Sequence, residues 1–296
     1  KLGKFNAAFD SKFDSKRIAQ MTEELNRAIA VGEITLEETS VKALEKFLRP
    51  RLSDFVSEGT SKARAKANRI RCVNNLGNVY KAGLAFAQDN GERLPWQLTP
   101  SGVRFHLDSA ATASEQYGRQ TNPNINEVMA HPYSLAAAGV YGLTTMKTEL
   151  VTPKILFSPC DSARTKSNEV VQENWGSYNT KEKGISKELA AGSSYVLIRG
   201  ADTQRPSSVY ATTRNWSAES LNTGNWLGFD SHQGNPRVID GLNLSQGQCV
   251  TMDGGAKQST NADFGAGGNI TKAANFSKGG VAKGRTSLNI IRGPGL

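Results

Sequence analysis

The stretch from residue 61 to residue 97 constrains the fold more than any other part of the chain, because a long helical pattern ends there at a clear turn. Apolar residues recur in it at steps of three and four, which places them on one face of an α-helix. These residues are Ile70, Val73, Leu76, Tyr80 and Leu84. The turn residues Asn90-Gly91 and Pro95 follow. The sequence therefore predicts an amphipathic helix that stops at this turn.

The front of this helix is basic, and so is the whole chain. The cations are Lys62, Arg64, Lys66, Arg69 and Arg71, and the formal net charge of the chain is +9. Such a charge favours contact with an anionic polysaccharide, an acidic surface or nucleic acid, although it also serves solubility alone. Nucleic acid is the least favoured partner, because the neighbouring aromatic residues Tyr80 and Phe86 stand at helical core spacing and are not interleaved for base stacking.

The chain ahead of this helix is predicted to form a separate helical module, residues 1–59. Two apolar stripes at helical spacing indicate two helices, followed by a short third segment. The first stripe is Ile18, Met21, Leu25 and Ile29, the second is Val41, Leu44 and Leu48, and the third segment is 52–56. Gly32 ends the first helix, and Thr35 with Glu38 has the pattern of a capping box for the second. Pro50 is expected to interrupt the second helix, because proline removes a backbone donor.

After Trp96 the pattern changes to turns, short helices and short strands. The clearest hairpin signal is Asp253-Gly254-Gly255, since Asp-Gly suits the tight turns that join antiparallel strands. The expected helices are 124–129 and 134–148, and the expected strands are 154–157, 194–199, 209–213, 249–252 and 256–259. The fold class predicted from this order is α+β.

Residues 265–296 are rich in glycine and contain no acidic residue. Their cations are Lys272, Lys278, Lys283, Arg285 and Arg292. This composition predicts a flexible basic C-terminal extension. Because the extension has little apolar surface with which to order itself, we expect something else to hold it, most economically a neighbouring subunit.

The three cysteines Cys72, Cys160 and Cys249 are far apart and fit no CxxC spacing, so no zinc or redox motif is predicted. Outside the cytoplasm two of them could form a disulfide and leave one over. The sequence leaves open which two would pair.

Motifs that carry chemistry are weak throughout the chain. The histidines His106, His131 and His232 share no metal-ligand spacing, and neither a G-x-S-x-G nor an H-E-x-x-H motif is present. The stretch 279–286 imitates a phosphate-binding loop but has Arg285 in place of lysine. Five aspartates near turns are more typical of local backbone support than of calcium ligands: Asp161, Asp202, Asp230, Asp240 and Asp253. We therefore predict a protein that is not an enzyme, with no catalytic, cofactor-binding or metal-ligating residue and no cofactor.

Several ordered segments resemble the pilin-type pseudopilins of Verrucomicrobia and Planctomycetes, the prepilin class with an H-x9-DG signature. The segments are Arg69–Leu76, Gly83–Phe86, Asp89–Gly91, Leu94–Trp96, Glu149–Leu156, Pro159–Ser162, Tyr195–Leu197, Arg214–Trp216 and Gly247–Gly254. Two of them depart from the family. Ser-Pro-Cys-Asp-Ser at 158–162 replaces Cys-Pro-Ser-Asp, and Asn243 stands where the signature has histidine.

The resemblance implies a pilin-like head, residues 60–264, in which a spine helix packs on an antiparallel β-sheet. The helical module 1–59 and the extension 265–296 would flank this head. Pseudopilins begin with a long apolar helix, whereas this chain begins with a charged, amphipathic stretch. We therefore expect either that an apolar segment was removed or that the chain is a soluble derivative of the pilin architecture. No run approaches the roughly 18 apolar residues that a membrane span needs.

The expected function is that of a non-enzymatic structural subunit of a self-assembling filament, extracellular or at the cell surface. Its partners would be other copies of itself, with an anionic surface or polysaccharide as a further partner. Two alternatives stay open: a pseudopilin-like accessory of a secretion or uptake system, and a basic module that binds polysaccharide or nucleic acid.

Overall fold

The structure is a computed structural model, and it describes residues 22–24, 26–28, 30–32, 41–98, 102, 140–167, 175, 193–229, 234–243, 245–276, 280 and 288–291. The chain forms two compact units, Lys1–Ala63 and Arg64–Leu296. The division between them falls within the longest helix, α3, which spans Val41–Asp89.

The first unit is helical, but its helices differ from the prediction. Residues 22–24, 26–28 and 30 are helical and the chain turns at Val31-Gly32, which confirms the predicted end at Gly32. The stripe Ile18, Met21, Leu25 and Ile29 lies outside the described residues. The predicted interruption at Pro50 and the separate segment 52–56 are wrong, because α3 is continuous through both. A proline costs a helix about 3 kcal/mol, and the long helical runs on either side of Pro50 outweigh that local loss.

The second unit contains a five-stranded antiparallel sheet with the strand order β4-β3-β2-β1-β5. Its strands are β1 (Tyr195–Ile198), β2 (Val209–Thr213), β3 (Gln246–Thr251), β4 (Ala256–Thr260) and β5 (Ile290–Ile291). The predicted strands at 194–199 and 209–213 are confirmed. So is the hairpin, in which Cys249 pairs with Lys257 and Val250 with Ala256. Helices and an antiparallel sheet together confirm the mixed α+β class.

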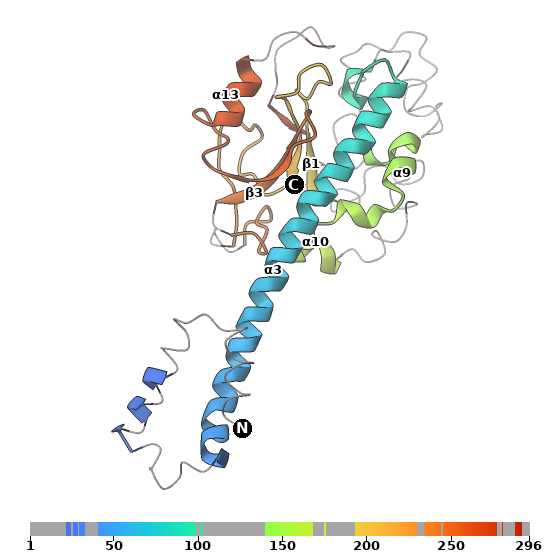
Figure 1. Cartoon of the computed structure of the whole chain (residues 1–296). Helices are drawn as coiled ribbons and strands as arrows, with labels where there is room; N and C mark the ends of the chain where they lie inside the picture. The colour runs from blue at the N-terminus through green and yellow to red at the C-terminus, as the bar shows by residue number, and fades with distance from the viewer. Residues whose placement is uncertain are drawn as a thin grey trace. The chain divides into compact units, whose positions relative to one another are not determined.

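Both faces of this sheet are buried, because successive side chains of a strand point to opposite faces. Tyr195 and Leu197 of β1 pack in one cluster with Leu76 and Phe86 of α3. Val196 and Ile198 pack in a second cluster on the other face, with two tryptophans and Phe264. Figure 1 shows α3 along one side of the sheet and α13 (Asn269–Phe276) on the side away from it. The sheet is therefore the middle layer of the second unit.

The face that α3 buries agrees with the predicted one only in part: Leu76 is buried and Tyr80 packs against the core, but the other three predicted residues are not buried. Ile70 is 53% exposed, and Val73, Tyr80 and Leu84 are half-buried. The buried positions are Cys72, Leu76, Val79, Ala82, Gly83, Phe86 and Ala87. The prediction followed the large apolar residues, whereas the buried positions also include the small residues Ala82, Gly83 and Ala87. The end of α3 at Asp89 agrees with the predicted turn, and the Asn90 side chain there donates a 2.7 Å hydrogen bond to the Phe86 carbonyl.

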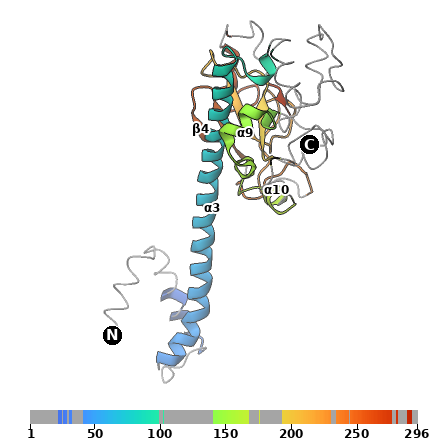
Figure 2. The same ribbon diagram turned by 90° about the vertical axis from the view of Figure 1, so that its right-hand side faces the viewer.

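Two further short elements differ between the prediction and the structure. Residues 154–157 do not form a strand: 154–156 belong to a 3-10 helix, η3 (Pro153–Leu156), and Phe157 follows its end. The Thr152 hydroxyl accepts a hydrogen bond from the Lys154 N–H at its start, and proline suits the first helical position. The predicted helix 134–148 is represented by α9 (Thr144–Leu150), which lies beside α3 in both views (Figures 1 and 2). The predicted helix 124–129 lies outside the described residues. The other short helices are η2 (Pro95–Gln97) and α10 (Ser162–Ser167).

The described residues of the C-terminal segment, 265–276, 280 and 288–291, belong to the second unit, and those of α13 and β5 pack on its own sheet. Helix α13 buries Ile270, Thr271 and Ala274. Strand β5 pairs antiparallel with β1, so that Leu197 lies opposite Ile291. The five apolar residues Ile270, Ala274, Leu288, Ile290 and Ile291 are all less than 9% exposed. Few as they are, these residues are enough to attach the segment to the sheet.

At Gly83 a side chain of strand β2 packs directly against α3, and the replacement of this glycine is our first prediction. A Cβ atom at Gly83 would lie 2.0 Å from Tyr210 Oη and 2.4 Å from Tyr210 Cζ. The Tyr210 ring is held between Tyr80 and Trp96, each with its ring centroid 6.0 Å away. Gly83→Ala should therefore lower the free energy of unfolding by about 1–3 kcal/mol, even though alanine is the better helix former. Urea unfolding measures the change.

Gly77, on the same helix, is the matched control. A Cβ atom there would meet only Ala256 Cβ at 3.9 Å, which is an ordinary contact. Gly77→Ala should therefore raise the free energy of unfolding by up to about 1 kcal/mol through helix propensity. If both variants were stabilised, α3 would not approach Tyr210 as closely as described.

Candidate functional site

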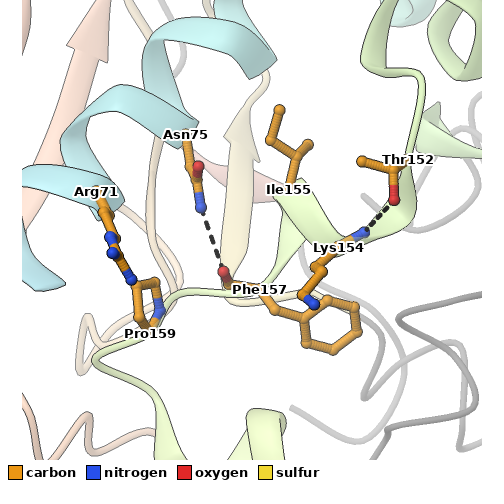
Figure 3. A pocket seen from close by; sticks show the side chains of 7 residues that line it. All are labelled: Arg71, Asn75, Thr152, Lys154, Ile155, Phe157 and Pro159. Carbon is orange, nitrogen blue, oxygen red and sulfur yellow. Dashed lines mark hydrogen bonds between the residues drawn. The ribbon is translucent and has the colours of Figure 1, made fainter.

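A pocket of about 350 Å³ lies between α3 and the segment that contains η3. Figure 3 shows the seven residues that line it: Arg71 and Asn75 from α3, and Thr152, Lys154, Ile155, Phe157 and Pro159 from the segment. Phe157 is buried, Asn75, Ile155 and Pro159 are half-buried, and Arg71, Thr152 and Lys154 are exposed. The pocket thus has an apolar wall and a polar rim.

One hydrogen bond links the two sides of the pocket, and two others lie within or next to the η3 segment. The Asn75 side chain of α3 donates a hydrogen bond of 3.3 Å to the Phe157 carbonyl across the pocket (Figure 3). The η3 turn, capped by Thr152, presents Lys154 and Ile155 to the same space. The Trp175 indole N–H donates to the Val151 carbonyl at 3.0 Å, just before this turn.

The rim carries two cations, Arg71 and Lys154, beside the apolar side chains Ile155 and Phe157. Guanidinium and ammonium groups donate hydrogen bonds to carboxylates and other anions, while the apolar wall shields carbon atoms from water. The pocket can therefore hold a small group that is anionic at one end and apolar at the other. The seven described lining residues include no carboxylate.

Two residues after the pocket-lining Pro159, Asp161 forms a buried ion pair that links three segments of the chain. Arg214, at the end of β2, contacts Asp161 with both Nε (2.6 Å) and Nη2 (2.7 Å). Its Nη2 also donates to the Val238 carbonyl at 3.1 Å, and its Nη1 donates to the Pro236 carbonyl. The two charged side chains are 1% and 0% exposed. Such two-point pairing fixes the orientation of both groups, so this ion pair positions the segment that follows η3.

Four of the five aspartates considered in the sequence are described, and they bind the backbone or pair with other side chains. Asp202 accepts a hydrogen bond from the Gln204 N–H at 3.0 Å and Asp253 accepts one from the Gly255 N–H at 2.8 Å. Asp240 accepts from the Ser162 hydroxyl at 2.5 Å. The hydrogen bond from the Thr251 hydroxyl lowers the pKa of Asp253. Within the described residues, no group of three or more His, Cys, Asp or Glu side chains could hold a metal ion.

Other residues weighed in the sequence cannot be assigned a place. The described residues do not include His106, His131, His232 or Asp230. Of the stretch 279–286, which resembles a phosphate-binding loop, they include only Gly280. The three cysteines are described, and all three are buried free thiols.

Sequence reasoning included Arg71 among the basic residues but missed the rest of the pocket. Residues 154–157 were expected to alternate as a strand, which would have sent their side chains to two opposite faces. The signal that was available is Thr152-Pro153, a capping residue followed by proline, which is typical of a helix start. No local signal links this segment to Arg71 and Asn75.

In the part of the chain that the structure describes, we find no helix that combines the length and the apolar character needed to cross a membrane. No family model, no curated protein and no solved structure matches this chain.

Proposed function

We propose that this chain is a non-enzymatic structural subunit that assembles with copies of itself into a filament, in the manner of a pilin, outside the cell or at its surface. In this proposal the part of α3 that packs on the sheet is the spine of a pilin-like head. Residues 72–87 of α3 supply the buried face, and the antiparallel sheet is the surface they bury.

The observation that carries the proposal is the change of exposure along α3. Every residue from 59 to 71 is exposed or half-buried, whereas the regular buried stripe begins at Cys72. The exposed stretch includes Ile70 with 53% of its surface accessible, next to exposed cations such as Lys66 and Arg71. Long helices gain most of their stability from packing, so an exposed helical stretch with an apolar residue offers a surface for another molecule. A second copy is the occupant that a filament requires.

The test is the assembly state of the full chain, measured by sedimentation velocity and by negative-stain microscopy. We expect concentration-dependent species larger than the monomer, with elongated particles at high concentration. Ile70→Asp should shift the protein toward the monomer, because it places a charge on the exposed stretch of α3. The substitution should change the folding stability by only about 0.5 kcal/mol, since Ile70 is exposed.

Ile70→Leu is the matched control, because it keeps an apolar side chain of similar size at the same position. It should assemble like the parent chain. A parent protein that sediments as a monomer at every concentration would refute the filament. If the Asp and Leu variants assembled equally, the assembly would not use this stretch of α3.

A further inference from the structure

The fold brings together two of the three cysteines, although they are far apart in the sequence. Cys72 lies on the buried face of α3, and Cys160 lies in the segment that follows η3. Both are buried, and they share one cluster with Ile239 and Leu242. The two thiols are close enough that each shifts the pKa of the other. Cys249 is in a different cluster, with Trp226 and Phe264.

The surroundings hold both cysteines in place. The Ser158 hydroxyl lies 2.7 Å from Cys72 Sγ and accepts a 3.1 Å hydrogen bond from the Cys160 N–H. On the other side, the Gly241 N–H donates to the Cys160 carbonyl at 2.9 Å. A Cβ atom at Gly241 would lie 2.6 Å from that carbonyl oxygen, so only glycine allows this approach. The backbone at Cys160 is thus held by Ser158 and Gly241.

We propose that Cys72 and Cys160 are the two partners of a structural disulfide that joins α3 covalently to the segment after η3, and that Cys249 stays a thiol. The pairing that the sequence left open is decided here by contact. A disulfide requires its two cysteines to lie side by side, and among the described residues Cys72 and Cys160 are the pair that do so.

The electrostatics of the reduced pair agree with this geometry. The hydrogen bond from the Cys160 side chain lowers the pKa of Cys72 to about 7, although burial opposes the shift. The same hydrogen bond, together with burial, raises the pKa of Cys160. Burial raises the pKa of Cys249 to about 12, which keeps it an unreactive thiol.

The oxidant belongs to the class of disulfides, either oxidised glutathione or the disulfide of an oxidoreductase. The Cys72 thiolate attacks one sulfur of the oxidant, and the first thiolate leaves. Cys160 then loses its proton to solvent and attacks the sulfur of Cys72, and the second thiolate leaves. Two protein thiols are oxidised, and one disulfide is reduced to two thiols. Because both cysteines are buried in the folded unit, the exchange takes place while the chain folds, before α3 is covered.

The first test maps the thiols of the full chain and needs no variant. The protein is refolded in a glutathione redox buffer, denatured, alkylated and digested, and its peptides are identified by mass. We expect the Cys72 and Cys160 peptides to be linked and Cys249 to be alkylated, with all three alkylated after reduction. A linkage that includes Cys249, a linkage between chains, or three alkylated thiols without reduction would each overturn the proposal.

The second test measures thermal unfolding with and without reductant. Reduction should lower the Tm of the parent chain by about 5–15 °C, because the disulfide closes a long loop. The difference should vanish in Cys72→Ser and in Cys160→Ser and persist in Cys249→Ala, the control. Equal shifts in all three variants, or no shift in the parent, would contradict the assignment. Neither test depends on filament assembly.

Discussion

A chain that ends at Phe264 should lose the cooperative unfolding transition of the second unit. The truncation removes strand β5 from the edge of the sheet and helix α13 from its outer face. It removes the buried side chains of Ile270, Leu288, Ile290 and Ile291. At about 1.5–3 kcal/mol for each large aliphatic side chain, the loss is about 6–12 kcal/mol. That is as large as the whole stability of a typical domain, which is about 5–15 kcal/mol.

Urea unfolding followed by circular dichroism and by tryptophan fluorescence measures this effect. The control is a chain that ends at Ile291, which keeps every described residue and should unfold at the parent midpoint. If the chain ending at Phe264 unfolded at the same midpoint as the parent, the segment would be an extension after all. Assembly experiments on the shorter chain could not be interpreted without this measurement, because its sheet would already be damaged.

Arg214→Met should lower the free energy of unfolding by about 3–5 kcal/mol, the largest loss we expect from a single substitution. The variant leaves the Asp161 carboxylate 0% exposed and without the guanidinium that contacts both of its oxygens. A buried charge that has lost its ion-pair partner is more costly than an absent pair. Urea unfolding measures the loss. The double variant Arg214→Met/Asp161→Leu should be more stable than Arg214→Met alone, because it also removes the buried carboxylate of Asp161.

Arg237→Met is the matched control for this experiment. Arg237 also contacts a carboxylate, that of Glu219 at 2.6 Å, but the two side chains are 21% and 67% exposed. It donates a further hydrogen bond to the Ser217 carbonyl at 2.7 Å. Because exposed pairs contribute little, we expect a loss of about 1 kcal/mol. Equal losses at Arg214 and Arg237 would mean that the Asp161 site is open to water.

The candidate pocket could be predicted from the sequence only in part. The basic character of Arg71 is evident in the sequence, and Thr152-Pro153 indicates a helical turn. What brings Lys154 and Phe157 to Arg71 is the packing of the η3 segment against α3, which includes the hydrogen bond from Asn75. The prediction of a strand at 154–157 is wrong because the side chains here are arranged around a 3-10 turn, so their burial does not alternate along the chain. Local periodicity carries no information about which distant segment lies opposite.

The C-terminal segment shows the same limit. Its high glycine content indicates that the segment has few apolar residues. It does not indicate that Ile290 and Ile291 complete the edge of the sheet. Strand pairing depends on an open edge elsewhere in the molecule, here that of β1. The composition of the segment carries no information about this edge. It therefore predicted an extension where the chain forms a strand.

By itself the sequence determined the elements that rest on local chemistry: the strands β1 and β2, the hairpin at Asp253-Gly254 and the end of α3 before Asn90. Each follows from β-branched runs or turn residues that act within a few positions. Tertiary structure alone decided which face of α3 is buried, where the C-terminal segment attaches and which cysteines meet. Those outcomes depend on how closely distant segments approach each other, and small residues such as Gly83 and Gly241 set that distance without a periodic signal.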